Sequence, residues 1–185
     1  MRVLGIAGSL RMDSHNARLL RAAAEAVEGD VELTVFDGLK DVPPFDQDDD
    51  VEPAPEAVAR LRAAIAEADA ILIATPEYNH SIPGQLKNAL DWASRPFPRS
   101  ALANKPAAVI GSSTGSFGAV WAQAELKKVL GATGARVVPA ELAVAKSAER
   151  FDADGDLVDE RVRERLREVV LALVEEAVPA IAAAA

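Results

Sequence analysis

The chain contains no cysteine, and this absence excludes several kinds of chemistry at once. Without thiols there are no disulfides, no thiol nucleophiles and no metal clusters held by cysteine. A chain without cysteine also suits a reducing compartment. We therefore expect a cytoplasmic protein.

Basic charge and long apolar runs are scarce as well. The 20 lysines and arginines are outnumbered by 29 acidic residues, so the formal net charge is −9. Nucleic acids and anionic membrane surfaces are bound by basic faces. No stretch approaches the roughly 20 apolar residues of a membrane span, and the apolar run at the N-terminus stops at Arg11. We expect neither a nucleic acid nor a membrane as partner.

Half of the residues are hydrophobic, which is enough for the core of one domain over residues 1–185. Apolar runs alternate strictly with helical patterns, and this alternation predicts a parallel sheet with helices on both faces. Five strands favour a three-layer α/β fold of the flavodoxin-like type, with strand order 2-1-3-4-5. The expected strands are residues 2–8, 31–37, 69–75, 106–113 and 135–144, and the expected helices are 16–28, 55–68, 82–94, 116–134 and 159–178.

Three loops should share one edge of that sheet, because the carboxyl ends of parallel strands lie on the same side. They follow the first, third and fourth strands, and all are rich in small, hydroxyl and amide groups. Their sequences are GSLRMDSHN (8–16), TPEYNHSIPG (75–84) and GSSTGSFG (111–118).

The first loop leads into a helix N-terminus, which offers free N–H groups and the positive end of a dipole. Ser9 and Ser14 add hydroxyls, Asn16 an amide and Arg11 a full charge. These groups suit a phosphate. The alternative is that Ser14 or Asp13 merely caps the helix and Arg11 is solvated. The loop matches neither G-x-G-x-x-G nor a P-loop.

The second loop contains the only tyrosine, Tyr78. A flat, partly polar ligand would lie against Pro76, and Asn79 would hydrogen-bond its edge. Glu77 makes a poor catalyst, since no second acid stands near it in the sequence. For Trp92, at helical spacing further on, packing is the favoured role.

The third loop matches the G-x-S-x-G pattern of a hydrolase elbow, with Ser113 as the nucleophile. Such enzymes need a later histidine, but His15 and His80 both come earlier, so the chain order disfavours a hydrolase. The alternative is a backbone cradle whose glycines let the chain approach a planar ring closely. The acidic stretch 46–50 is expected to be a solvated loop. The stretch 152–156 is similar to a calcium loop, but its glycine comes too early and Arg163 stands where the closing glutamate belongs, so no metal is expected.

With these loops placed, the chain resembles the NAD(P)H-dependent FMN reductase family, near its quinone and chromate reductase branch. The resemblance is strongest over GSLRMDSHNARLL and TPEYNHSIPGQLKNALDWASRP, and weaker over PPFDQDD and FDADGDLVDERVRERL. It implies a flavodoxin-like fold, noncovalently bound FMN, NAD(P)H as co-substrate, and a homodimer or homotetramer with active sites near subunit interfaces.

The resemblance also implies roles for particular residues, all of them binding roles rather than catalytic ones. Those expected at the FMN phosphate are Ser9, Arg11, Ser14 and Asn16. Those expected around the flavin ring are Pro76, Glu77, Tyr78 and Asn79, with Ser81 at the margin, and Ser113 and Gly115 from the third loop. Trp121 stands where related sequences often have arginine, which puts assembly or the choice of acceptor in question.

The expected activity is hydride transfer from NAD(P)H to bound FMN, and then reduction of a small-molecule acceptor: a quinone, an oxidised metal anion, an azo or nitro compound, or free flavin. The main alternative is a flavodoxin-type electron carrier or redox sensor with little NAD(P)H turnover. Only 4% of the residues are aromatic, which leaves the flavin face open to a nicotinamide and favours the reductase. A third alternative is an α/β binding protein without flavin.

Overall fold

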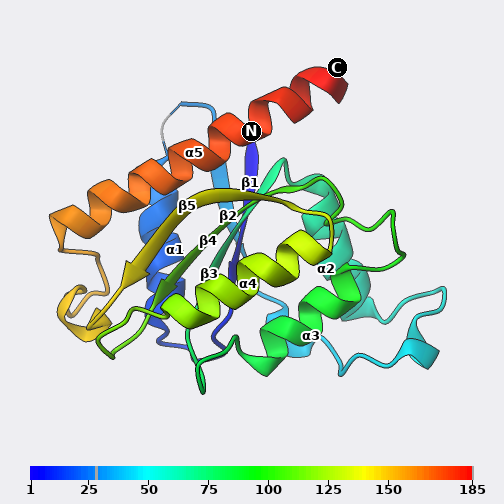
Figure 1. Cartoon of the computed structure of the whole chain (residues 1–185), viewed down its shortest axis with the longest axis horizontal. Coiled ribbons are helices and arrows are strands. Elements are labelled where there is room, and N and C mark those ends of the chain that lie inside the picture. Colours follow the sequence, from blue (N-terminus) through cyan, green and yellow to red (C-terminus); the bar gives the residue numbers. More distant parts are fainter. Residues whose placement is uncertain (28, 185) are drawn as a thin grey trace.

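A parallel sheet forms the middle layer of the molecule (Figure 1). The computed structural model describes residues 1–27 and 29–184, and within them the five strands pair in the order β2-β1-β3-β4-β5, which confirms the prediction. The strands are β1 (Arg2–Ala7), β2 (Glu32–Phe36), β3 (Ala70–Thr75), β4 (Pro106–Ser112) and β5 (Arg136–Val144). Strands β3 and β4 are buried along their whole length, which explains their continuous apolar sequences.

The two edge strands, β2 and β5, have more exposed sequences. In β5, the register against β4 shifts between the pairs Ala107–Val137 and Val109–Glu141. Pro139 lies within this irregular stretch, where its missing N–H breaks no regular ladder. The predicted edge position of this strand is confirmed.

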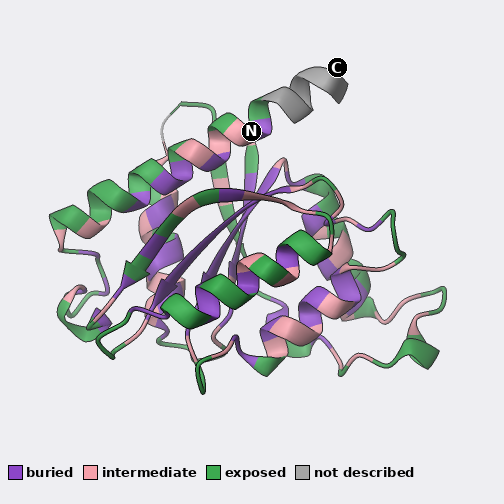
Figure 2. Ribbon diagram, viewed as in Figure 1, coloured by how far each residue is buried: buried purple, intermediate pink, exposed green. Residues whose placement is uncertain are grey.

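Helices cover both faces of the sheet (Figure 1). Helices α1 (His15–Ala26) and α5 (Glu160–Ala184) pack on one face, and α2 (Glu56–Glu67), α3 (Gly84–Ala93) and α4 (Val120–Ala132) cover the other. Each helix turns buried residues toward the sheet and exposed residues outward (Figure 2). Among residues 1–27 and 29–184, no helix combines the length and the apolar character that a membrane crossing requires.

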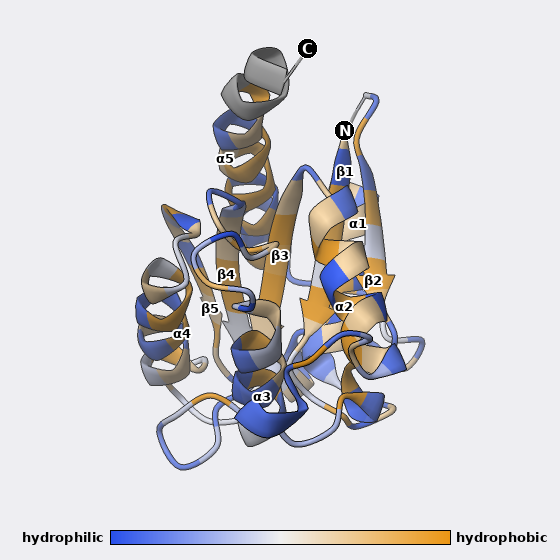
Figure 3. Cartoon of the chain, turned by 90° about the vertical axis from the view of Figure 1, so that its right-hand side faces the viewer, coloured by the Kyte–Doolittle hydropathy of each residue, from blue (hydrophilic) through white to orange (hydrophobic). Residues whose placement is uncertain are grey.

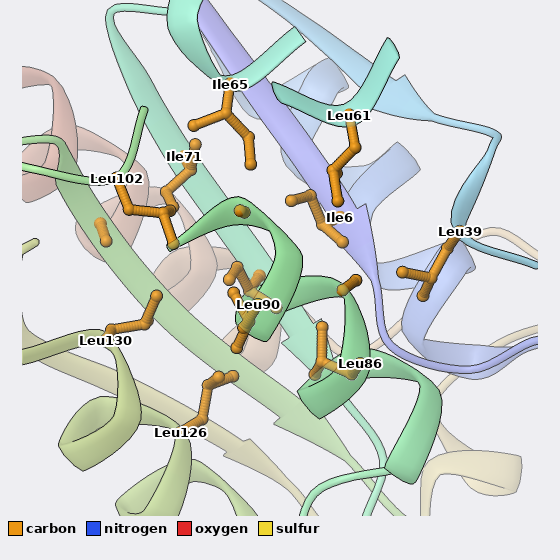
Figure 4. Close-up of a cluster of buried hydrophobic side chains, with 14 of the residues drawn as sticks. Ile6, Leu39, Leu61, Ile65, Ile71, Leu86, Leu90, Leu102, Leu126 and Leu130 are labelled. Carbon is orange, nitrogen blue, oxygen red and sulfur yellow. The ribbon is translucent and has the colours of Figure 1, made fainter. Parts of the chain in front are cut away.

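The core under α2, α3 and α4 follows a simple pattern: each helix contributes two large aliphatic residues four positions apart (Figure 4). Such pairs lie on one face of a helix. They are Leu61 and Ile65, Leu86 and Leu90, and Leu126 and Leu130. Ile6 and Ile71 meet them from the sheet (Figure 4). Hydrophobic residues predominate in the strands, whereas the helices also carry hydrophilic residues (Figure 3).

Helix α3 also fastens the long loop that follows β2. The Asn88 side chain accepts from Phe45 N (2.6 Å) and donates to Pro43 O (2.8 Å). Trp92 is fully buried, and its Nε1 donates to the same carbonyl at 2.9 Å. The packing role predicted for Trp92 is confirmed, and it links the LKNALDW and PPFD segments physically.

Candidate functional site

An open pocket lies at the carboxyl ends of the strands, where the sequence places the three loops. It is lined by Ser9, Arg11, Ser14, His15, Asn16, Pro76, Glu77, Tyr78, Ser112, Ser113, Thr114 and Ser147. Most of the residues predicted for the site are therefore together, from loops far apart in the chain. Asn79, Ser81 and Gly115 lie in the same loops but outside this lining.

The N-terminus of α1 opens into the pocket. Ser14 is the N-cap, and its Oγ accepts a hydrogen bond from Asn16 N at 3.2 Å. The Ser14 hydroxyl hydrogen is not used in that bond, so Ser14 can cap the helix and still donate to a ligand. The two roles that the sequence presented as alternatives are thus compatible.

Arg11 provides the full positive charge at this end of the pocket. Its backbone N–H donates to Ser9 Oγ at 3.4 Å, and its Nη2 donates to Asp13 O at 3.3 Å. Neither bond joins the guanidinium to a carboxylate, so its charge remains available to an anion. A helix N-terminus with a nearby arginine and two serines is well suited to a phosphate.

Asn16 is buried, and both ends of its amide bind the backbone of Ser112. Its Nδ2 donates to Ser112 O (3.1 Å), and its Oδ1 accepts from Ser112 N (2.9 Å). These bonds fix the start of α1 against the end of β4. A direct contact of Asn16 with phosphate stays a prediction, whereas its positioning role is evident.

The second loop forms a tight hairpin. Tyr78 and Ser81 exchange both backbone hydrogen bonds at 3.0 Å, while Asn79 and His80 at the tip have φ angles of 53° and 60°. Two consecutive left-handed residues are the signature of a type I′ turn, in which asparagine is favoured. The hairpin holds Tyr78 half-exposed beside the pocket and turns the backbone sharply away at Asn79.

Glu77 serves α4 as a cap supplied by another loop. Helix α4 begins after Ala119, a residue without a capping side chain, and Glu77 Oε2 accepts from Trp121 N (3.0 Å) and Ala122 N (3.1 Å). A carboxylate here also complements the positive end of the helix dipole. Its other oxygen, Oε1, lies 3.6 Å from His80 Nδ1. The capping role accounts for an acid in the site.

The third loop does not form a hydrolase triad. Ser113 Oγ accepts from Gly115 N at 3.0 Å, and His15 Nδ1 lies 2.7 Å from Ser147 Oγ rather than at Ser113. The loop then turns through Gly118, whose φ is +61° and where a Cβ would lie 2.6 Å from the backbone carbon of Ala143. Gly118 lies outside the G-x-S-x-G pattern, and its missing side chain lets the loop pack closely against the end of β5.

A fourth loop, between β5 and α5, completes the pocket, and sequence reasoning missed it. Ser147 is fully buried, touches His15, and donates its N–H to Ser113 O at 3.0 Å. Phe151, from the same loop, stacks on the His15 ring. The signal was available in principle, since the carboxyl end of the fifth strand lies on the same edge as the others.

The acidic stretches act as local turns. Asp46 caps a 3-10 turn through Asp48 N, and Asp152 accepts from the N–H groups of Asp154 and Asp156. Within residues 1–27 and 29–184, no three histidine or acidic side chains come together as a metal site.

An aromatic cluster stands at the start of α4, next to the hairpin. The Trp121 ring meets His80 at 4.8 Å and Phe117 at 4.9 Å between centroids, both edge-to-face. Phe117 and Trp121 are 63% and 41% exposed, which is unusual for such large rings. Trp121, which stands where related sequences often have arginine, thus forms an apolar surface next to the hairpin.

Comparison with known proteins agrees with this geometry. Residues 1–149 match the family model for NADPH-dependent FMN reductase. An NAD(P)H-dependent FMN reductase of Pseudomonas aeruginosa is 40% identical over 174 residues, covering 94% of this chain and 93% of the relative. A 2-hydroxy-1,4-benzoquinone reductase of a Burkholderia species is 39% identical over 168 residues, covering 90% and 91%.

Comparison with a solved structure indicates the same family. The flavoenzyme NAD(P)H:acceptor oxidoreductase of Paracoccus denitrificans superposes with a TM-score of 0.85 at 40% identity, covering 95% of this chain and 96% of that one. The chain therefore belongs to the NADPH-dependent FMN reductase family. It is an oxidoreductase, with FMN as cofactor and NAD(P)H as reductant.

The pocket passes a test of fit for FMN. Ser112 Oγ is buried in its wall without a hydrogen-bond partner among the described residues, as expected of a group that awaits a ligand. A Cβ at Gly8 would lie 2.9 Å from Leu86 and 3.3 Å from Pro76, so glycine lets the first loop pack tightly against the second. Hydroxyl, amide and guanidinium donors predominate, which suits an anion.

Proposed function

We propose that this protein is an NAD(P)H-dependent FMN reductase that delivers electrons to quinones. The observation that carries the proposal is one pocket that brings Arg11 and the α1 N-terminus, which suit a phosphate, together with Pro76, Tyr78 and Ser113, which suit a ring. A flavin nucleotide has the same two parts. Quinones are chosen among the acceptors because relatives named as quinone or benzoquinone reductases cover most of the chain.

In this proposal the phosphate is held by Ser9, Arg11 and Ser14, with Asn16 fixing their loop against β4. Pro76 and Tyr78 would contact the ring, and backbone groups near Asn79 and Gly115 would contact its edge. FMN bound there would supply the transfer of a hydride from NAD(P)H and of two electrons to the quinone. The protein's own residues would bind and orient, and the proton that completes the hydroquinone would come from water.

The half-exposed Tyr78 and the open pocket leave room above the ring for a nicotinamide. An electron carrier of the flavodoxin type would instead cover that face with aromatic rings. The residues expected to line the ring here include a single aromatic one, Tyr78. This difference supports the reductase over the carrier.

A second copy of the chain is the proposed partner, as a homodimer or a homotetramer. The exposed rings of Phe117 and Trp121 support this, because large rings in contact on a surface commonly mark an interface. Sedimentation analysis of Trp121→Ala, with Leu171→Ala on α5 as control, tests it: weaker association of the Trp121 variant alone is expected. The use of NAD(P)H supports the expected cytoplasmic location.

The test of function is steady-state oxidation of NADH and NADPH by the FMN-loaded protein, with benzoquinone as acceptor. We expect rapid turnover that needs FMN and a quinone together. Tight FMN binding without turnover of either nucleotide would support the electron-carrier alternative. Failure to bind flavin at all would support the α/β protein without flavin.

A further inference from the structure

His15 occupies a place in the site that the proposed FMN contacts do not use. It is the first residue of α1, directly after the N-cap Ser14, and it lines the pocket together with Ser9 and Arg11. A histidine at the N-terminus of a helix, in an anion pocket, is a titratable group next to the ligand's charge.

The ring of His15 is held in place on two sides. Its Nδ1 lies 2.7 Å from the Oγ of the fully buried Ser147. Its plane stacks on Phe151 at 5.5 Å and 13°. These contacts occupy one nitrogen and one face of the ring, which leaves Nε2 for another partner.

Burial and two nearby arginines disfavour the protonated form of the His15 ring. Burial is the largest cause that lowers the pKa of His15, followed by Arg18 and Arg11, whereas Asp13 acts in the opposite direction. The groups on the other side of the ring are the uncharged Ser147 and Phe151, with exposed Lys146 and Glu149 and half-buried Arg150 nearby in the chain. A phosphate would add the negative charge that favours the protonated form.

We propose that His15 is a further phosphate-binding residue, whose positive charge develops when the anion binds and which sets the preference of the site for FMN over riboflavin. This inference rests on the proposed function. By linkage, a group protonated more readily in the complex than in the free protein strengthens binding as the pH falls. Each unit by which FMN raises the pKa of His15 corresponds to about a tenfold gain in affinity at acidic pH.

The test compares dissociation constants for FMN and riboflavin, from flavin fluorescence at constant ionic strength between pH 5.5 and 8.5. Variants are His15→Asn, which keeps a hydrogen-bonding group near Ser147, and His15→Phe, which keeps the stacking on Phe151. The matched control is His80→Asn, because His80 is exposed and outside the pocket lining.

FMN's own phosphate loses charge near pH 6, which weakens its binding in every variant. The quantity to compare is therefore the dissociation constant for riboflavin divided by that for FMN. Between pH 8 and pH 6, this ratio should rise about three- to tenfold more in the wild type than in either His15 variant. The His80→Asn protein should follow the wild type. Riboflavin binding should change little in any variant, which also shows that the variants are folded.

Histidine NMR tests the same point without a variant at position 15, since His80→Asn leaves a single histidine. FMN should raise the pKa of His15, and riboflavin should not. Identical pH profiles for wild type and His15→Asn, or a His15 pKa that FMN does not raise, would overturn the inference while the proposed function stands. If the wild type binds neither FMN nor riboflavin at any pH, both the inference about His15 and the proposed function are wrong.

Discussion

Asn16 and Ser112 are joined by two hydrogen bonds, one to each backbone group of the serine, although they are 96 residues apart in the chain. Both residues are buried, and no other residue type presents a donor and an acceptor so close together on a side chain of this length. The pair therefore sets the distance between the loop offered to the phosphate and the strand that leads to Ser113.

Changing Asn16 to aspartate should be costly, because a carboxylate cannot donate to the Ser112 carbonyl and would lie buried against it. We expect a loss of about 2–4 kcal/mol in the free energy of unfolding. Urea denaturation at pH 7 measures it. Gln47→Glu makes the same change at an exposed amide and should cost less than about 0.5 kcal/mol. Equal effects at the two sites would show that the Asn16–Ser112 pair contributes nothing special.

Variants of Glu77 distinguish its role as a helix cap from a role as a general acid or base. Glu77→Ala should destabilise the protein by about 1–2 kcal/mol through the open end of α4. Glu77→Gln should cost less than about 1 kcal/mol, since one amide oxygen can still accept from Trp121 N and Ala122 N. Thermal unfolding and quinone turnover are measured together. Turnover by Glu77→Gln should stay within about threefold of wild type, whereas a general acid or base would lose about a hundredfold or more.

Removal of the Arg11 side chain should weaken the binding of FMN much more than that of riboflavin. Removing a charge-assisted contact to phosphate costs about 1.5–2 kcal/mol, so Arg11→Ala should weaken FMN binding about 10- to 30-fold. Riboflavin binding should change less than about twofold, because the missing group faces the phosphate. Arg21→Ala, an exposed arginine on α1, is the control for net charge. A similar loss for both ligands would place Arg11 away from the phosphate.

Lowering the pH should destabilise the N-terminus of α5. The pKa of Asp159 is held below its ordinary value, chiefly by the backbone hydrogen bond from Val162, with Arg150 and Arg161 N–H adding to it. A depressed pKa stabilises the folded state above the unfolded pKa of about 3.9, and this stability is lost as the pH falls through the folded value. Wild type should therefore exceed Asp159→Asn in urea stability at pH 6, and the gap should close toward pH 3. A gap that does not change with pH would contradict this.

Much of the architecture could be predicted, because the signals involved are short-range. Continuous apolar runs such as AILIAT are typical of buried parallel strands, and their alternation with helical patterns leaves few topologies. Pro139 within the fifth strand favours an edge or bulged strand, in agreement with the predicted order and with the register shift in β5. The site's position also followed, since loops after parallel strands share an edge.

The side-chain partnerships could not be predicted in the same way. Glu77 meets backbone groups 44 and 45 residues later, and His15 meets Ser147 across 132 residues. Each contact depends on how two loops pack after the sheet has formed, and no local sequence pattern shows which residues of those loops will meet. The structure adds a positioning role for Asn16 and Glu77, which both hold loops in place, while their contacts with FMN stay predictions.

The most direct test of the central claim is an anaerobic absorbance measurement of the FMN-loaded protein mixed with NADPH, and separately with NADH. We predict that the bound flavin bleaches within seconds with at least one nucleotide, and that benzoquinone restores its colour. A flavin spectrum that stays unchanged with both nucleotides, yet bleaches with dithionite, would contradict the claim that this pocket joins FMN to a nicotinamide.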